Sequence, residues 1–371
     1  MFGTILISII TLMHVYVFWR AAGVPVVQRH ISRKFLIGWG VVLWTGFYLG
    51  RVYGHHGNGL SAAVIEFFGM NWMAVLFLLF TALLVLDVAT GFGLLFKRHV
   101  SRLRGWALLA GSLLSIVALF QGMRPPIINT YDVQLSGLPR QMDGTILVAV
   151  SDMHIGSLLG EQWLAARIEQ IEGQKPDLVV LLGDIFEGHT SPPEALIRIL
   201  SRLKAPLGVW AVLGNHEFHG NANTAENLFT SAGIQVLRNR WAEVRPGFSL
   251  GGVDDLTSIR RSGRSKQPLK QLLSDRPPGV AVLLSHTPWK VEQAATAEID
   301  LMLSAHTHGG QIWPFSYLVR TRYPFLEGRY DVRGMTLLVS RGAGTWGPRM
   351  RLWHPGEILR VTLHGKPNRR H

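Results

Sequence analysis

The feature that most constrains the fold is a set of long apolar runs confined to the first third of the chain. They cover residues 2–19, 35–50, 72–96 and 105–123. Each approaches or exceeds the roughly 20 residues that an α-helix needs to cross the hydrocarbon core of a bilayer. We therefore predict a transmembrane module of four helices over residues 1–124.

The first two runs have alternatives to a spanning helix. A cleaved signal peptide also begins with an apolar run, but Arg20 follows the first run and no small-residue cleavage site stands there. The second run is short and contains glycine, so a re-entrant or interfacial segment is the alternative at that place.

Positive charge in the short loops indicates the orientation of the module. Basic residues gather between the first two runs and between the last two. They are Arg20, Arg29, Arg33 and Lys34, followed by Lys97, Arg98, Arg102 and Arg104. The other flanks carry little more than Arg51 and Arg124. We therefore expect a multi-pass protein of the cell (inner) membrane with everything after residue 124 outside the cytoplasm, provided that the helix count is four.

Two carboxylates, Glu66 and Asp87, lie in or beside the third run. A carboxylate inside a membrane is by default a candidate functional group. The alternative is that Glu66 lies at the level of the lipid headgroups and that Asp87 bonds to a neighbouring helix.

Composition limits the chemistry that the remaining chain can perform. None of the 371 residues is cysteine, which excludes disulfides, a cysteine nucleophile and any cysteine-ligated metal. A metal would be held by His, Asp, Glu or Asn. The net charge of +13 is concentrated in the membrane module: 10 Lys and Arg face 2 acids before residue 131, against 27 and 22 after it. That modest later excess, without interleaved aromatic and arginine residues, leads us to expect no nucleic-acid partner.

Downstream of the membrane module, the sequence pattern predicts a tether over 125–142, with a first strand as the alternative within it, a domain over 143–366 and a tail over 367–371. Short β-rich apolar runs alternate with helical patterns in the domain, which is typical of an α/β layered fold. The predicted strands are 146–150, 178–182, 208–213, 280–284, 301–303, 335–339 and 358–363, and the predicted helices are 163–171, 193–203 and 225–232.

Polar residues that can bind metal stand directly after five of these strands. They are Asp152 and His154; Asp184 and Glu187; Asn215, His216 and Glu217; His286; and His306 and His308. Open α/β sheets bind ligands at the carboxyl ends of their strands, so we expect these side chains to meet in one crevice.

The spacing and type of these residues indicate a site with two ions. In an extended chain, residues i and i+2 project to the same side, so Asp152 with His154, and His306 with His308, can each reach one ion. Mixed oxygen and nitrogen donors suit Mn, Fe, Zn or Co. The donors are too many for one ion, whereas two ions about 3.5–4 Å apart form a clamp for displacement at phosphorus.

This motif series resembles the calcineurin-like metallophosphoesterase family, whose order is D-x-H, GD-xx-(D/E), GNH-(D/E), a lone His and H-x-H. The run from His306 to Gln311 and the later Ser340-Arg341-Gly342 are similar to the bacterial membrane-associated branch. The resemblance covers roughly residues 130–365. It implies an α/β fold in which a layered metallophosphoesterase β-sandwich, flanked by helices, follows the four-helix transmembrane module.

The resemblance also implies roles for individual residues. One ion is held by Asp152, His154, Asp184 and His308, and the other by Asp184, Asn215, His286 and His306. Asp184 bridges the two divalent ions, which the donor types leave open as Mn, Zn, Fe or Co. His216 contacts the phosphoryl oxygen and protonates the leaving group, and Glu217 orients a neighbour.

Other residues are weaker candidates. Glu187 replaces the commoner Asp of the family, and Ala305 replaces the Gly before the H-x-H pair. Arg341 is predicted to bind a substrate phosphate, with a structural ion pair as the alternative. For His189 and His219 solvated loop positions are the alternative to a role in the site. The basic cluster of Arg260, Arg261, Arg264, Lys266 and Lys270 is interpreted as a solvated loop or a surface that faces lipid headgroups.

The function that the resemblance implies is a membrane-anchored phosphoester hydrolase. A hydroxide that bridges the ions would attack the phosphorus of a phosphoester, phosphodiester or pyrophosphate. The anchor favours a lipid-linked substrate and a role in lipid metabolism, while a soluble nucleotide or sugar phosphate stays open. The alternative is a catalytically silent sensor or binding subunit of a membrane complex, against which the intact ligand set argues. The oligomeric state is not predicted.

Overall fold

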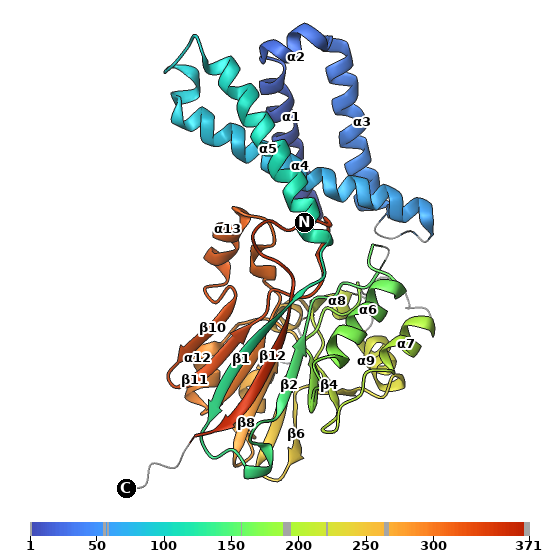
Figure 1. Cartoon of the computed structure of the whole chain (residues 1–371), viewed down its shortest axis with the longest axis vertical. Coiled ribbons are helices and arrows are strands. Elements are labelled where there is room, and N and C mark those ends of the chain that lie inside the picture. Colours follow the sequence, from blue (N-terminus) through green and yellow to red (C-terminus); the bar gives the residue numbers. More distant parts are fainter. Residues whose placement is uncertain are drawn as a thin grey trace. The chain divides into compact units, whose positions relative to one another are not determined.

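The computed structural model describes residues 2–54, 57, 59–156, 158–187, 194–219, 222–262 and 267–366. The chain forms two compact units, which are described separately (Figure 1). Unit 1 comprises Met1–Arg124 with Gly347–Trp353, and unit 2 comprises Pro125–Trp346 with His354–His371.

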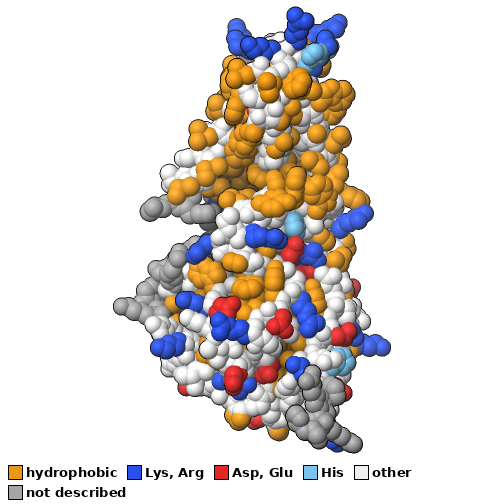
Figure 2. Space-filling view, turned by 90° about the vertical axis from the view of Figure 1, so that its left-hand side faces the viewer, with side chains coloured by type: hydrophobic (Ala, Val, Ile, Leu, Met, Phe, Trp, Pro, Cys, Tyr) orange, Lys and Arg blue, Asp and Glu red, His pale blue; other side chains and the backbone are white. Residues whose placement is uncertain are grey.

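Unit 1 is helical, and its long helices agree with the predicted transmembrane module. Its helices are α1 (Phe2–Ala21), α2 (Pro25–His30), α3 (Arg33–Val52), α4 (Leu60–Ala89), the 3-10 turn η2 (Gly91–Gly93) and α5 (Val100–Met123). Of these described helices, α1, α3, α4 and α5 are long and apolar enough to cross a membrane. The second apolar run is thus one continuous helix. Figure 2 shows apolar side chains over this unit, with lysine and arginine side chains gathered at one end.

The third span differs from its prediction of 72–96. Helix α4 begins at Leu60 and ends at Ala89, before the glycines of η2. The prediction began too late because Glu66 and Asn71 interrupt the apolar run, yet both side chains are buried within the unit. Gly69 lets α4 approach α3 closely, since a Cβ there would lie 2.5 Å from the carbonyl oxygen of Gly46.

Asp87 forms a buried ion-pair cluster at the end of α4. Its carboxylate lies 2.6 Å from Nε of Arg20 and 2.9 Å from Nη2 of Arg104, and it accepts a hydrogen bond from Tyr16. The bonding interpretation of Asp87 is therefore confirmed. The cluster joins the end of α1 and the start of α5 to one point, so the loops after α1 and before α5 lie at the same end of the bundle.

The described residues of unit 2 form two six-stranded sheets. The first has the order β1 (Ile127–Leu135), β12 (Glu357–Gly365), β2 (Ile146–Val150), β3 (Leu178–Leu181), β4 (Val209–Ala211) and β5 (Gln235–Val236). The second has the order β10 (Gly328–Val332), β11 (Met335–Val339), β9 (Leu301–Ser304), β8 (Val280–Ser285), β7 (Phe248–Val253) and β6 (Arg240–Arg245). Strands β2 to β5 are mutually parallel, as are β7, β8, β9 and β11.

The sheets pack face to face and carry helices on their outer faces. A buried cluster that includes Leu147, Val180, Leu250 and Leu303 lies between the sheets. Helices α6 (Glu161–Glu172), α7 (Glu194–Leu200) and α9 (Ala222–Ser231) pack on the first sheet, and α11 (Pro268–Ser274) and α12 (Val291–Thr296) on the second. The fully buried parallel strands explain their continuous apolar runs. The predicted helix-flanked β-sandwich is confirmed.

Half of the predicted tether is part of the sheet. Strand β1 occupies nine of residues 125–142 and pairs in parallel with β12 along its whole length. The alternative of a first strand in this segment is therefore confirmed. The sequence signal for it is weak because most of its exposed positions are polar, as expected at a sheet edge. The predicted tail, 367–371, lies outside the described residues.

Candidate metal centre

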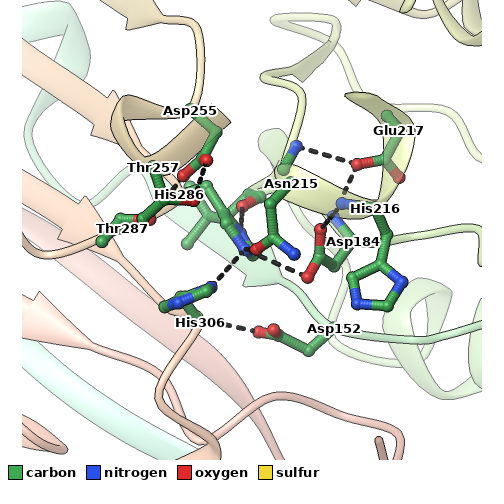
Figure 3. Close-up of polar contacts among 12 residues, drawn as sticks. Asp152, Asp184, Asn215, His216, Glu217, Asp255, Thr257, His286, Thr287 and His306 are labelled. Atoms are coloured by element: carbon green, nitrogen blue, oxygen red, sulfur yellow. Dashed lines mark hydrogen bonds and ion pairs between the residues drawn. The ribbon is translucent and has the colours of Figure 1, made fainter. Parts of the chain in front are cut away.

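The predicted metal-binding residues come together where strands of the two sheets end. Figure 3 shows five of them: Asp152, Asp184, Asn215, His286 and His306. Asp152 and His154 follow β2, and Asp184 follows β3. Asn215, His216 and Glu217 begin the short helix α8 (Asn215–His219) after β4. His286 follows β8, and His306 and His308 follow β9. Because parallel strands of both sheets end here, five distant segments supply one site.

One group of donors consists of Asp152, His154 and His308. The Nε2 atoms of the two histidines lie 3.1 Å apart, and Nε2 of His308 lies 3.3 Å from Oδ1 of Asp152. All three side chains are buried. Two imidazole nitrogens and a carboxylate oxygen that face one another in the interior fit a divalent cation.

A second group consists of Asp184, His286 and His306, with Asn215 beside it. Nε2 of His286 lies 3.2 Å from Oδ2 of Asp184 and 3.3 Å from Oδ1 of Asn215. The same atom lies 3.1 Å from Nδ1 of His306. All seven predicted ligands are thus brought together in two adjacent groups that fit two cations.

Asp184 also belongs to a third set of converging donors, with His154 and His216. Asp184 therefore lies close both to His154 of the first group and to His286 and His306 of the second group. Its Oδ1 accepts a hydrogen bond from the backbone N–H of His216 at 2.8 Å, and its Oδ2 faces His286. The two oxygens of one carboxylate thus point to different parts of the site, as a bridging ligand requires.

The backbone of the seven candidate ligands is strained. Five of the seven have left-handed φ angles: Asp152 (49°), His154 (49°), Asp184 (52°), His306 (72°) and His308 (52°). Such conformations of non-glycine residues cost on the order of 1–3 kcal/mol each and cluster at functional sites. Stability alone would not select this arrangement, so the strain supports a functional role for the whole set.

Two glycines make room for Asp184. Gly183 has φ +90°, and a Cβ there would lie 2.4 Å from the backbone nitrogen of Gly214. A Cβ on Gly214 would lie 2.2 Å from Oδ1 of Asp184. The glycines of the GD and GN motifs are therefore required by close approach of the two loops.

Glu217 and Glu187 support the centre in different ways. Both carboxylate oxygens of Glu217 accept backbone N–H groups, those of Gly214 and of three consecutive residues beginning at Asp184. Glu217 therefore fixes the backbone of two ligand loops, rather than acting on the reacting group. Glu187 lies 2.8 Å from Nδ1 of His154 and 3.0 Å from Nδ1 of His216. It therefore directs Nε2 of His154 toward the first group.

The histidines of the second group also have outer partners. Nδ1 of His286 donates to the carbonyl oxygen of Leu182 at 2.8 Å, which leaves Nε2 as the ligand atom. Nε2 of His306 lies 2.9 Å from the hydroxyl of Tyr323. Thr287, next to His286, donates to the buried carboxylate of Asp255. The contacts with Leu182 and Tyr323 leave Nε2 of His286 and Nδ1 of His306 to face the second group.

The electrostatics of the second group follow from close charges in the interior. Burial alone would raise the pKa of Asp184, but the imidazoles of His286 and His216 hold it well below its ordinary value. Burial would lower the pKa of His286, but Asp184 raises it well above its ordinary value. Burial and the neighbouring His286 lower the pKa of His306 to about 4. Asp184 therefore favours the protonated, positively charged form of His286. A metal cation at this place would compete with that proton for the imidazole nitrogen.

The pKa of His216 is raised, whereas that of His306 is lowered. Burial would lower the pKa of His216, but Asp184 and Glu187 raise it to about 9. Burial and the charge of Asp184 raise the pKa of Glu217 to about 7, against the backbone N–H groups that it accepts. Asp184 and Glu187 thus favour the protonated form of His216.

The remaining candidates are less central. Arg341 donates to Glu357 at 2.7 Å, and its Nε lies 3.5 Å from Glu327, which favours the structural ion pair. Its predicted role in substrate binding stays a prediction. Ala305 is fully buried between the sheets. The ring of His219 lies 4.9 Å from that of His216. His189, Arg264 and Lys266 lie outside the described residues, as do the side chains at 260 and 261.

Tyr323 and Asp255 support the site and were missed by the sequence reasoning. Tyr323 follows a helix rather than a strand, and no pattern in one sequence connects it to His306. Asp255 does follow strand β7, so the strand-end argument could have identified it. It binds hydroxyls of Thr257 and Thr287 and is not among the converging donors.

Comparisons with known proteins agree with this geometry. The model of the calcineurin-like phosphoesterase family matches residues 146–310. An uncharacterized metallophosphoesterase of Aquifex aeolicus is 33% identical over 65% of this chain and 93% of its own length. One of Campylobacter jejuni is 32% identical over 66% of this chain and 65% of its own. A Bos taurus transmembrane protein with metallophosphoesterase domain is 29% identical over 70% of this chain and 62% of its own length. About a third of each of the last two relatives therefore lies outside the match.

Replacement of Glu187 tests the support that it gives to the first group. We expect Glu187→Gln to weaken divalent metal binding by about 10- to 100-fold, because the tautomer and orientation of His154 lose their carboxylate partner. Titration of the chelated, detergent-purified chain with Mn²⁺ measures the affinity. The matched control is Glu169→Gln, whose side chain is 68% exposed and which should bind like the wild type. Equal affinities of the two variants would contradict this role of Glu187.

Proposed function

Because the chain belongs to the calcineurin-like phosphoesterase family, we propose that it is a membrane-anchored hydrolase of phosphoesters that uses two divalent ions. The observation that carries the proposal is the convergence of seven donors from five strand ends into two adjacent groups. The four helices that can span a membrane supply the anchor.

Each group would hold one ion, with Asp184 shared between them. The first ion would take Asp152, His154 and His308, and the second would take Asn215, His286 and His306. When bound, two such cations lower the pKa of coordinated water and stabilise negative charge on phosphoryl oxygens. The donor set suits Mn, Zn, Fe or Co, and we do not choose among them.

The protein's own residues would bind and orient the phosphoryl group. The contact between Nδ1 of His216 and Glu187 directs Nε2 of His216 away from that carboxylate. We assign to this Nε2 the hydrogen bond to the phosphoryl oxygen and the donation of a proton to the leaving group. Glu217 keeps the Asp184 and Asn215 loops together, so that His216 is fixed relative to the ligands.

The substrate that we propose is the phosphoester, phosphodiester or pyrophosphate of an amphiphilic lipid. The support is the anchor, which keeps the catalytic unit in the plane where such molecules are concentrated. A soluble nucleotide or sugar phosphate is the competing substrate class. A binding or sensing role without turnover is the alternative function, against which all seven donors argue.

Hydrolysis by the purified chain tests the proposal. After chelation, re-addition of Mn²⁺, Zn²⁺ or Co²⁺ should restore turnover of bis-p-nitrophenyl phosphate, p-nitrophenyl phosphate or a phosphoester in a lipid extract. We expect Asp184→Asn to lose about 100-fold or more of that turnover, because an uncharged amide with one oxygen replaces the carboxylate whose two oxygens face both groups. The control Asp132→Asn changes a carboxylate that is 72% exposed and should retain it. A folded wild type that binds two ions yet hydrolyses none of these compounds would support the silent binding subunit instead.

We further propose that unit 2 lies outside the cytoplasm, as the basic loops indicate. Arg29, Arg33 and Lys34 lie in or beside one loop, and Lys97 and Arg98 in the other, at the end of the bundle that the Asp87 cluster defines. An excess of positive charge at one end favours its retention in the cytoplasm.

Single cysteines can test this orientation directly, because the chain has none of its own. In intact spheroplasts, a membrane-impermeant maleimide should label Ser274→Cys in unit 2 and leave Gln28→Cys in α2 unlabelled. Both positions are exposed, so accessibility to the reagent depends on the side of the membrane. Labelling of Gln28→Cys alone would place unit 2 in the cytoplasm and overturn the orientation.

A further inference from the structure

Large apolar side chains are scarce on the surface of unit 2, and most of them gather at one place. Among the described residues of this unit, those strongly exposed are Ile127, Phe315, Tyr317, Leu318 and Trp346, at 41–65% exposure. Three of the five belong to the single helix α13 (Phe315–Arg322), which follows the 3-10 turn η4 (His308–Gly310) at one end of the second sheet (Figure 1).

Trp346 is held beside the start of this helix. Its backbone N–H donates to Oε1 of Gln311 at 2.9 Å, and Nε2 of Gln311 donates back to the Trp346 carbonyl at 3.2 Å. Gln311 lies between η4 and α13. The indole, which is 43% exposed, therefore extends the apolar surface of the helix.

The same surface is basic. Arg320 and Arg322 lie in the last turn of α13 and are exposed, and the helix sequence FSYLVRTR contains no acid. We call the set Phe315, Tyr317, Leu318, Arg320, Arg322 and Trp346 the α13 patch. Aromatic and aliphatic side chains together with arginine are the composition that binds the interface of an anionic bilayer.

The α13 patch adjoins the metal centre at both ends of its helix. His308, a ligand of the first group, lies in η4 before the helix. Tyr323, directly after it, contacts Nε2 of His306 at 2.9 Å. Trp289 stacks on Tyr323 with ring centroids 6.0 Å apart, and the guanidinium of Arg322 lies 4.5 Å above Trp289. The patch and the metal ligands are therefore parts of one continuous structure.

We propose that the α13 patch docks onto the surface of an anionic phospholipid bilayer, so that the metal centre opens at the level of the headgroups. A bilayer is favoured over other occupants because the chain is anchored in one. Only Arg124–Pro126 separate α5 from β1, and three residues span at most about 11 Å. The start of β1 therefore stays close to the membrane. The docking surface goes beyond the proposed hydrolysis, and its test does not involve turnover.

Spin labels measure the depth of the patch in the membrane. The full chain would carry a single nitroxide at Leu318→Cys or, as the control, at the exposed Ser274→Cys on α11, in nanodiscs of phosphatidylcholine and phosphatidylglycerol. We expect collisions with a water-soluble nickel chelate to be several-fold fewer at 318 than at 274, and collisions with oxygen to be more frequent. Addition of Phe315→Ser and Tyr317→Ser should return the label at 318 to the accessibility of the control.

A second pair of variants tests the contribution of the arginine charge to docking. Arg320→Gln should raise the accessibility of the label at 318, whereas Arg333→Gln, whose side chain is 67% exposed and lies in the turn between β10 and β11, should not. A label at 318 as accessible to the nickel chelate as the control would overturn the proposal. So would dipolar coupling between two labels at 318, which would show that a second copy covers the patch.

Discussion

The structure of the site depends on the burial of two carboxylates, Asp152 and Asp184, which are 0% and 2% exposed. Burial raises the pKa of Asp152, and an isolated carboxylate in a protein interior is unstable by several kcal/mol. The surrounding groups are of the kind that compensates negative charge: imidazoles of His154, His286 and His308, and backbone N–H groups. Cations would complete the same compensation. The histidine-rich composition of the strand ends follows from this requirement.

Bringing these side chains together requires strained backbone conformations at five of the seven residues. The two sheets are rigid enough to maintain those conformations. Each candidate ligand follows a strand whose side chains are fully or almost fully buried, so the starting point of each loop is fixed. Glu217 then ties two of the loops together through four backbone N–H groups. The glycines at 183 and 214 allow the close approach that this requires. Fixed strands, one buried carboxylate and two glycines thus define the position of Asp184.

The sequence predicted most of the site because its residues follow apolar strands in short, ordered motifs. The α/β layers and the four long apolar helices were predictable for the same reason, since buried strands and long apolar helices have simple patterns. Strand β1 was predicted only as an alternative to a tether, because half of an edge strand faces water and its pattern is partly polar. The start of α4 was missed because Glu66 is buried among helices instead of marking the end of a span. The ion pairs of Arg341 and the contact of Tyr323 depend on residues distant in sequence, which one sequence does not connect.

The central claim is that two divalent ions share Asp184. Anomalous X-ray scattering from crystals of the full chain grown with Mn²⁺ tests it most directly. The account predicts two anomalous peaks roughly 3.5–4 Å apart, with one oxygen of Asp184 facing each or one oxygen between them. The donors of the first peak would be Asp152, His154 and His308, and those of the second Asn215, His286 and His306. A single peak, or two peaks of which neither is coordinated by Asp184, would contradict it.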